Sequence, residues 1–173
     1  MSGVDVAIID SGGANLASLV YALERLGAKA VVTTEDALIP TLTRPLLGIC
    51  LGMQLLFETS EEGEGGDTRC LGLIPGRVAR MPASPERPVP HMGWNRLHLL
   101  QADPLLEGIG ESDYFYFVHS YAAPVGPHSL AVSEYGAEFT AVARRGNFRG
   151  AQFHPERSAR PGARLLANFL KIT

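Results

Sequence analysis

The chain has 173 residues, of which 46% are hydrophobic and 19% charged, and its formal net charge is −3. This length and balance are typical of one soluble domain, so we expect a single domain over residues 1–173. The slight acidity excludes the basic surface that would bind a nucleic acid or an anionic membrane. No apolar run approaches the roughly eighteen residues of a spanning helix, and no secretory signal is visible. With two cysteines, Cys50 and Cys70, we expect a cytoplasmic protein without a disulfide framework.

Short apolar runs alternate with helical patterns in the first half of the chain, and strands dominate the second half. The predicted strands are 4–9, 28–33, 45–49, 76–81, 93–99, 114–118, 129–135, 139–143 and 149–153. The predicted helices are 15–26, 35–42 (weakly), 53–58 and 162–170. Residues 60–67 are acidic and rich in glycine, which favours a mobile surface loop. This order predicts a three-layer α/β sandwich with a mostly parallel central sheet.

Residues 48–52 read Gly-Ile-Cys-Leu-Gly, which is the pattern of a sharp turn between a strand and a helix. Glycines on both sides of Cys50 let the backbone turn tightly and leave room for a substrate beside the sulfur. The helix dipole favours the thiolate, which is the nucleophilic form. An isolated cysteine is more often a core residue than a nucleophile, so the motif needs partners.

Those partners are predicted far downstream, where residues 150–156 read Gly-Ala-Gln-Phe-His-Pro-Glu. His154 is a candidate general base, and Glu156 is placed to hold its imidazole in one tautomer. Pro155 fixes φ between them and stiffens the pair. Cys50, His154 and Glu156 are therefore a candidate nucleophile, base and orienting carboxylate.

The motifs at residues 48–54 and 153–156 resemble those of the triad (class I) glutamine amidotransferases, and the likeness runs from the first predicted strand to the last helix. The resemblance implies that family's fold and hydrolysis of L-glutamine to glutamate and ammonia through a thioester on Cys50. No cofactor is expected. His91, His98 and His128 share no metal-ligand spacing with one another, so no metal site is expected either.

The resemblance also implies residues that hold the substrate. The N–H of Leu51, directly after the nucleophile, is a candidate donor to the tetrahedral oxyanion. Gln54 looks like the residue that reads the glutamine head group, with a helix-surface amide as the plainer alternative. Ser120 and Tyr121 resemble the backbone segment along the amino-acid end of the substrate, and Gly52 leaves room beside the sulfur.

Three stretches select one group within the family, in which the glutaminase is a separate subunit of an enzyme of histidine biosynthesis. They are residues 90–95, 116–121 and 152–158. Ammonia released into water at neutral pH becomes ammonium and stops being a nucleophile, so it must be delivered through a closed passage. The resemblance implies that the subunit receiving it is a cyclase. We therefore expect a heterodimer. By resemblance, Asn15, Trp94 and Tyr116 lie on the shared face.

A family feature is absent between Thr33 and Pro45. There the family has a Pro-Gly-x-Gly loop that supplies the second oxyanion donor, and roughly thirty more residues, including a strand, between Thr34 and Glu35. Three explanations are open: these 173 residues omit a mobile segment of the natural chain, the gene carries a deletion, or the oxyanion site is built differently. We favour the first, because a central strand is costly to lose.

Two other functions remain open from the sequence. The chain could be the glutaminase subunit of another amidotransferase, such as anthranilate or pyridoxal phosphate synthase, although residues 90–95 argue against it. It could also be a non-catalytic binding module that kept the triad motifs and lost its oxyanion loop. The observation that separates these alternatives is whether residues are missing near Thr34.

Overall fold

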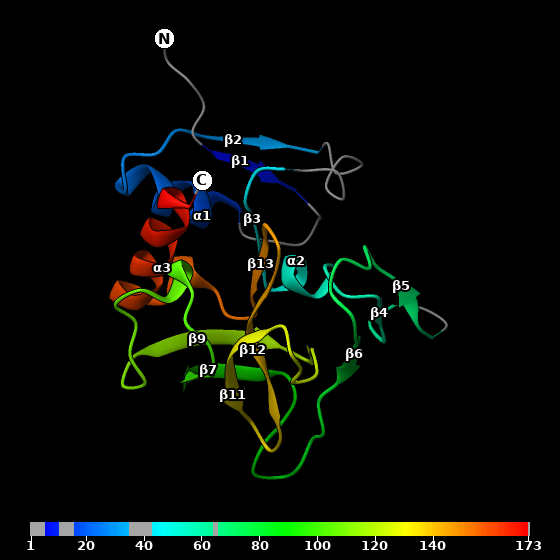
Figure 1. Cartoon of the computed structure of the whole chain (residues 1–173). Coiled ribbons are helices and arrows are strands. Elements are labelled where there is room, and N and C mark those ends of the chain that lie inside the picture. Colours follow the sequence, from blue (N-terminus) through cyan, green and yellow to red (C-terminus); the bar gives the residue numbers. More distant parts are fainter. Residues whose placement is uncertain (1–5, 11–15, 35–42, 64–65, 173) are drawn as a thin grey trace.

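The computed structural model describes residues 6–10, 16–34, 43–63 and 66–172, so the predicted helix at 35–42 lies outside the described residues (Figure 1). The helices are α1 (Leu16–Arg25), α2 (Leu51–Gln54) and α3 (Ala159–Lys171), with 3-10 turns η2 (Pro104–Leu106) and η3 (Pro155–Arg157). The strands are β1 (Val6–Ile9), β2 (Ala30–Thr33), β3 (Leu46–Ile49), β4 (Thr59–Ser60), β5 (Thr68–Arg69), β6 (Arg77–Arg80), β7 (His91–Arg96), β8 (His98–Leu99), β9 (Tyr114–His119), β10 (Tyr121–Ala122), β11 (Ser129–Glu134), β12 (Glu138–Arg145) and β13 (Phe148–Ala151).

A five-stranded sheet with the order β3-β13-β12-β11-β8 forms the centre of the fold. The predicted α/β class is confirmed, but the strand directions differ from the expected mostly parallel sheet. Only β3 and β13 run parallel, and the other neighbours are antiparallel. The reason is that β11, β12 and β13 follow one another through short turns, and such turns join antiparallel neighbours. β1 and β2 form a separate parallel pair connected through α1.

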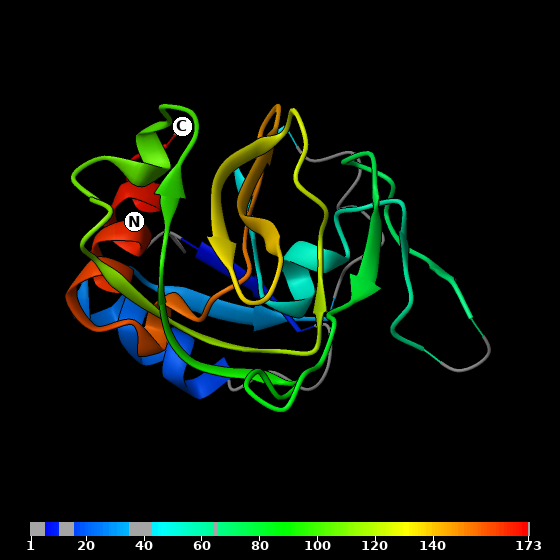
Figure 2. The same cartoon turned by 90° about the horizontal axis from the view of Figure 1, so that it is seen from below.

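Two apolar clusters cover the two faces of the central sheet. One packs Leu165 of α3 against β9, β12 and β13, and the other packs Met53 of α2 against β6 and β12. β12 contributes to both clusters, with Ala141 and Val142 in the first and Ala143 in the second. Figures 1 and 2 show α1 and α3 on one side and α2 with β4, β5 and β6 on the other. The central sheet and the elements packed on its two faces are the predicted three layers.

Two smaller sheets surround the carboxyl end of β3. β7 and β9 pair antiparallel along six residues each, from His91↔His119 to Arg96↔Tyr114, and we call them the β7–β9 ribbon. The second small sheet has the order β10-β6-β4-β5, and β4 and β5 border the predicted loop at 60–67. In the part of the chain that the structure describes, no helix is long and apolar enough to cross a membrane.

A buried carboxylate joins η2 to β12 and β13. The side chain of Asp103 is fully buried, and its oxygens lie 3.1 Å from Nε of Arg149 and 2.9 Å from Nη1 of Arg144. The N–H of Leu105 also donates to Asp103, at 2.8 Å. Burial opposes ionisation, but these partners outweigh it and hold the pKa of Asp103 below its ordinary value.

We predict that Asp103→Asn lowers the free energy of unfolding by about 3 to 5 kcal/mol at neutral pH, because it leaves Arg149 buried without a counter-ion. Since folding lowers the pKa of Asp103, this stabilisation is present above the ordinary aspartate pKa of about 3.9 and is lost as the pH falls below it. Glu111→Gln, which removes an exposed pair with His98, should cost less than about 1 kcal/mol. Urea unfolding measures both, and equal losses would contradict the prediction.

Candidate active site

Cys50 occupies the sharp turn between β3 and α2. Its φ is 53° and its ψ −108°, a left-handed conformation that residues other than glycine rarely adopt. The N–H of Cys50 donates to the carbonyl of Ala151 at 2.8 Å, which continues the parallel pairing of β3 with β13. The cysteine is therefore held at the carboxyl edge of both strands.

Gly48 and Gly52 play different parts in this turn. A Cβ at Gly48 would overlap the backbone of Gly52, so only glycine lets the start of α2 fold back over β3. A Cβ at Gly52 would meet no atom within 4 Å, so the space beside it is open. Leu51 begins α2, and the first N–H groups of a helix have no acceptor within the helix. The Leu51 N–H is thus available in the way that the oxyanion prediction requires.

His154 and Glu156 meet at η3, which follows β13. Nδ1 of His154 donates to Oε1 of Glu156 at 2.9 Å, and this carboxylate is almost completely buried. Because Nδ1 is used, Nε2 is the ring nitrogen left for the sulfur. Hydrogen bonding with Cys50 and Glu156, supported by their charges, raises the pKa of His154 to about 9 against the effect of burial. An imidazolium at neutral pH favours a thiolate beside it.

Two further groups surround the sulfur of Cys50. The thiol is directed at the carbonyl of Val118 at 3.7 Å, and Nε2 of Gln152 donates to the sulfur at 3.8 Å. Gln152 is fully buried and directly follows β13. The end of β9 and the end of β13 therefore enclose the nucleophile together.

Gln54 lies inside the molecule, so the helix-surface alternative is wrong. Its side chain is 3% exposed, and Nε2 donates to the carbonyl of Tyr121 at 2.9 Å and to Oε1 of Gln152 at 3.1 Å. Oε1 of Gln54 is buried without a partner among the described residues. A buried acceptor of this kind needs a donor, and its role toward the substrate remains a prediction.

A pair of buried histidines, His91 and His119, lies beside this site, and sequence reasoning did not predict their contact. Nδ1 of His119 donates to the carbonyl of Tyr121 at 2.8 Å, and Nδ1 of His91 donates to Nε2 of His119 at 3.0 Å. Burial lowers the pKa of each to about 4, so both stay neutral. The carbonyl of Ser120 accepts from the N–H of Met81 at 2.9 Å. The segment predicted to face the substrate, Ser120 and Tyr121, is therefore held by hydrogen bonds on its backbone. The contact between His91 and His119 could have been inferred only by pairing the two strands that carry them.

The predicted partner face is only partly described. Trp94 is 53% exposed and its ring packs against that of Tyr116 at 5.7 Å between centroids. The guanidinium of Arg157 lies over the Tyr116 ring, 4.4 Å from its centroid. Asn15 lies outside the described residues. Trp94 and Tyr116 thus share one surface, and its role as an interface remains a prediction.

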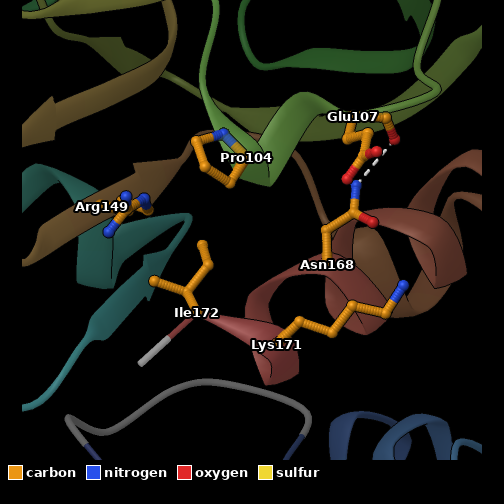
Figure 3. Close-up of a pocket in the computed structure, with 6 residues that line it drawn as sticks. All are labelled: Pro104, Glu107, Arg149, Asn168, Lys171 and Ile172. Carbon is orange, nitrogen blue, oxygen red and sulfur yellow. Dashed lines mark hydrogen bonds between the residues drawn. The ribbon is translucent and has the colours of Figure 1, made fainter.

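A separate cavity of about 360 Å³ is lined by residues from around η2, β13 and the end of α3 (Figure 3). Arg149 lines it from the early part of β13, together with Asn168 and Lys171 of α3. Arg149 pairs in register with Leu47, whereas Cys50 follows the other end of β3. This cavity is therefore not the glutamine site. Among the described residues no group of three or more His, Cys, Asp or Glu side chains could hold a metal ion.

Comparison with known proteins places this geometry in a family. The family model described as glutamine amidotransferase class-I matches residues 33–172. The chain belongs to the class I glutamine amidotransferases. Two solved structures show the same fold: a putative GMP synthase protein from Thermoplasma acidophilum (TM-score 0.69, 15% identity, 95% of this chain and 91% of the other) and one described as glutamine amidotransferase (TM-score 0.68, 19% identity, 98% of each).

Curated relatives narrow the assignment to one group. The chain is 48% identical to the imidazole glycerol phosphate synthase subunit HisH of Xylella fastidiosa (strain Temecula1 / ATCC 700964), over 97% of this chain and 98% of the relative. It is 46% identical to subunit HisH 2 of Legionella pneumophila (strain Paris), over 96% and 98%. Within its family the chain belongs with these HisH subunits, which confirms the group predicted from the sequence.

We predict that His154→Gln slows alkylation of Cys50 by iodoacetamide about tenfold or more at about pH 7, because the variant lacks the imidazolium that favours the thiolate. At about pH 10, where ordinary thiols are ionised, the two rates should converge. His128→Gln, at a half-buried histidine that bonds the Arg144 carbonyl, is the control. Cys70, whose pKa is raised by burial, should react slowly in every sample. Identical pH profiles for the variant and the parent would show that His154 does not act on Cys50.

Proposed function

We propose that the protein is the glutaminase subunit of an imidazole glycerol phosphate synthase and that Cys50, His154 and Glu156 are its catalytic residues. The observation that carries the proposal is the His154 imidazole, whose Nδ1 bonds Oε1 of Glu156 at 2.9 Å just after β13, the strand whose end also accepts the N–H of Cys50 at 2.8 Å. The names of the curated relatives support this assignment over another amidotransferase.

The chemistry follows from this arrangement. The thiolate of Cys50 attacks the side-chain amide carbon of glutamine, and the N–H of Leu51 stabilises the oxyanion that forms. His154 gives its proton to the leaving nitrogen, so ammonia departs and a thioester remains. The neutral imidazole then takes a proton from water as the water attacks the thioester, and glutamate leaves as the thiolate returns. Glu156 holds the ring in one tautomer throughout.

The substrate residues are proposed to work as a rigid frame. Oε1 of Gln54, buried without a partner among the described residues, is an acceptor that a donor of bound glutamine would satisfy. Tyr121 and Ser120 lie on backbone fixed by other hydrogen bonds, as a binding segment should be. Gly52 leaves open space next to the nucleophile.

The ammonia is proposed to pass to a cyclase subunit that makes imidazole glycerol phosphate and AICAR (5-aminoimidazole-4-carboxamide ribonucleotide), in a heterodimer in the cytoplasm. An exposed tryptophan against a tyrosine is a favoured anchor for a protein partner, and Trp94 and Tyr116 form such a pair. We place the shared face there, with Asn15 as a further contact.

We also propose that a segment belongs between Thr34 and Glu35 and supplies the second oxyanion donor. The match with the Xylella relative spans 198 residues, more than the 173 of this chain, so that relative has residues without a counterpart here. Among the described strands, β1 pairs only with β2 and β3 only with β13, which leaves an edge of each for another strand. Sequencing the gene tests this directly: a continuous reading frame through codons 34 and 35 would overturn it and favour a deletion.

We predict that Cys50→Ala abolishes glutamine hydrolysis, because no other described thiol lies at the elbow, while synthesis from added ammonia by the partner survives. Cys70→Ala is the matched control and should retain both activities. Glutamate release and product formation are measured on the assembled enzyme. Glutamine hydrolysis by Cys50→Ala would overturn the proposed function, and a wild-type chain without activity would favour a non-catalytic module.

Regulation by the partner is a separate prediction. An oxyanion donor that is out of place costs about two to three orders of magnitude in rate, so a partner that orders it should raise glutamine turnover by a comparable factor. Trp94→Ala should weaken this activation and leave alkylation of Cys50 unchanged. Leu100→Ala, at another exposed apolar residue, is the control. Full activity of the isolated chain would show that the partner only receives ammonia.

A further inference from the structure

Ser158 is a completely buried serine between η3 and α3, directly after the segment that carries His154 and Glu156. Its hydroxyl has one proton to donate and lone pairs to accept with. The proton goes to the carbonyl of His154, at 2.7 Å. The oxygen accepts the N–H of Tyr116, at 2.9 Å. Both functions of the hydroxyl are therefore used.

These bonds close a ring between two segments that are far apart in the sequence. The N–H of His154 donates to the carbonyl of Tyr116 at 2.9 Å. Both backbone groups of His154 are thus tied to both backbone groups of Tyr116, one pair directly and the other through Ser158. Because Tyr116 lies in the middle of β9, paired with Trp94 of β7, this ring fixes the base segment to the β7–β9 ribbon.

The ring acts on the position of the catalytic groups. Glu156 is held by the same short turn, and its carboxylate reaches Nδ1 of His154 at 2.9 Å. On its other side the turn packs directly against α3. The approach is so close that a Cβ at Gly162 would overlap the carbonyl of Pro155. The N–H of Ser158 also donates to the Pro155 carbonyl, at 3.1 Å. Removing the hydroxyl leaves the N–H of Tyr116 without its acceptor and removes one of the two ties between the base segment and β9.

We infer that Ser158 is a positioning residue that keeps the His154 imidazole aligned with Cys50 by bonding the base segment to β9. The inference rests on the proposed catalytic role of His154. Ser158 touches neither the substrate nor the sulfur in this role, and it acts only through the backbone of His154. A misplacement of about 1 Å in a catalytic group costs on the order of a hundredfold in rate, so the hydroxyl affects turnover more than binding.

The test is Ser158→Ala in the enzyme assembled with its synthase partner. The kcat for glutamine hydrolysis should fall about 10- to 100-fold with KM nearly unchanged, because alignment rather than affinity is lost. The titration of the His154 imidazole, followed by NMR, should move from near pH 9 toward the ordinary histidine value of about 6.5, because its contacts with Cys50 and Glu156 loosen.

Ser133→Ala is the matched control, because Ser133 is also a buried serine but its hydroxyl has no partner among the described residues. It should leave kcat and the His154 titration unchanged. Unchanged values in Ser158→Ala as well would overturn the inference. If Ser158→Ala does not fold, amide exchange in the parent protein decides: the N–H of Tyr116 should be as protected as that of His154, and rapid exchange at Tyr116 alone would overturn the inference. Neither of these results would contradict the proposed function, because that proposal is tested separately by the Cys50→Ala variant.

Discussion

The parallel pairing of β3 with β13 is the constraint on which the site depends. Ile49 lies opposite Ala151, and the Cys50 N–H extends the pairing to the Ala151 carbonyl at 2.8 Å. This register brings the two strand ends to one edge, where the chain turns into α2 on one side and toward His154 on the other. A shift by one residue would reverse every side chain of the strand and separate the nucleophile from its base.

The β7–β9 ribbon connects the other parts of the account. Its inner end places the Val118 carbonyl 3.7 Å from the sulfur, and its middle bonds both backbone groups of His154 through Tyr116 and Ser158. Its outer surface presents Trp94. The same two strands therefore touch the nucleophile, hold the base and face solvent with an aromatic anchor. A partner bound to that surface would rest on the element that aligns the catalytic groups, which is a contiguous physical route for coupling.

Local patterns explain what the sequence could predict. The elbow around Cys50 and the contact of His154 with Glu156 depend on near neighbours, so their geometry could be predicted, as could most strands and α3. The antiparallel directions of β11 and β12 and the shortness of α2 depend on tertiary pairing and were not. The bond of Ser158 with Tyr116 and the ion pair of Asp103 with Arg149 join residues distant in sequence, and a single sequence carries no signal for them. Asn15 and residues 35–42 lie outside the described part of the chain.

The most direct test of the central claim is to treat the protein with a glutamine analogue that carries an electrophilic carbon at the position of the amide. Peptide mass spectrometry then identifies the modified residue. The account predicts one covalent adduct, on Cys50, which forms faster than with a small electrophile lacking the amino-acid end and is prevented by excess glutamine. Equal modification of Cys50 and Cys70, or an adduct that glutamine does not suppress, would contradict a glutamine site at the β3–β13 edge.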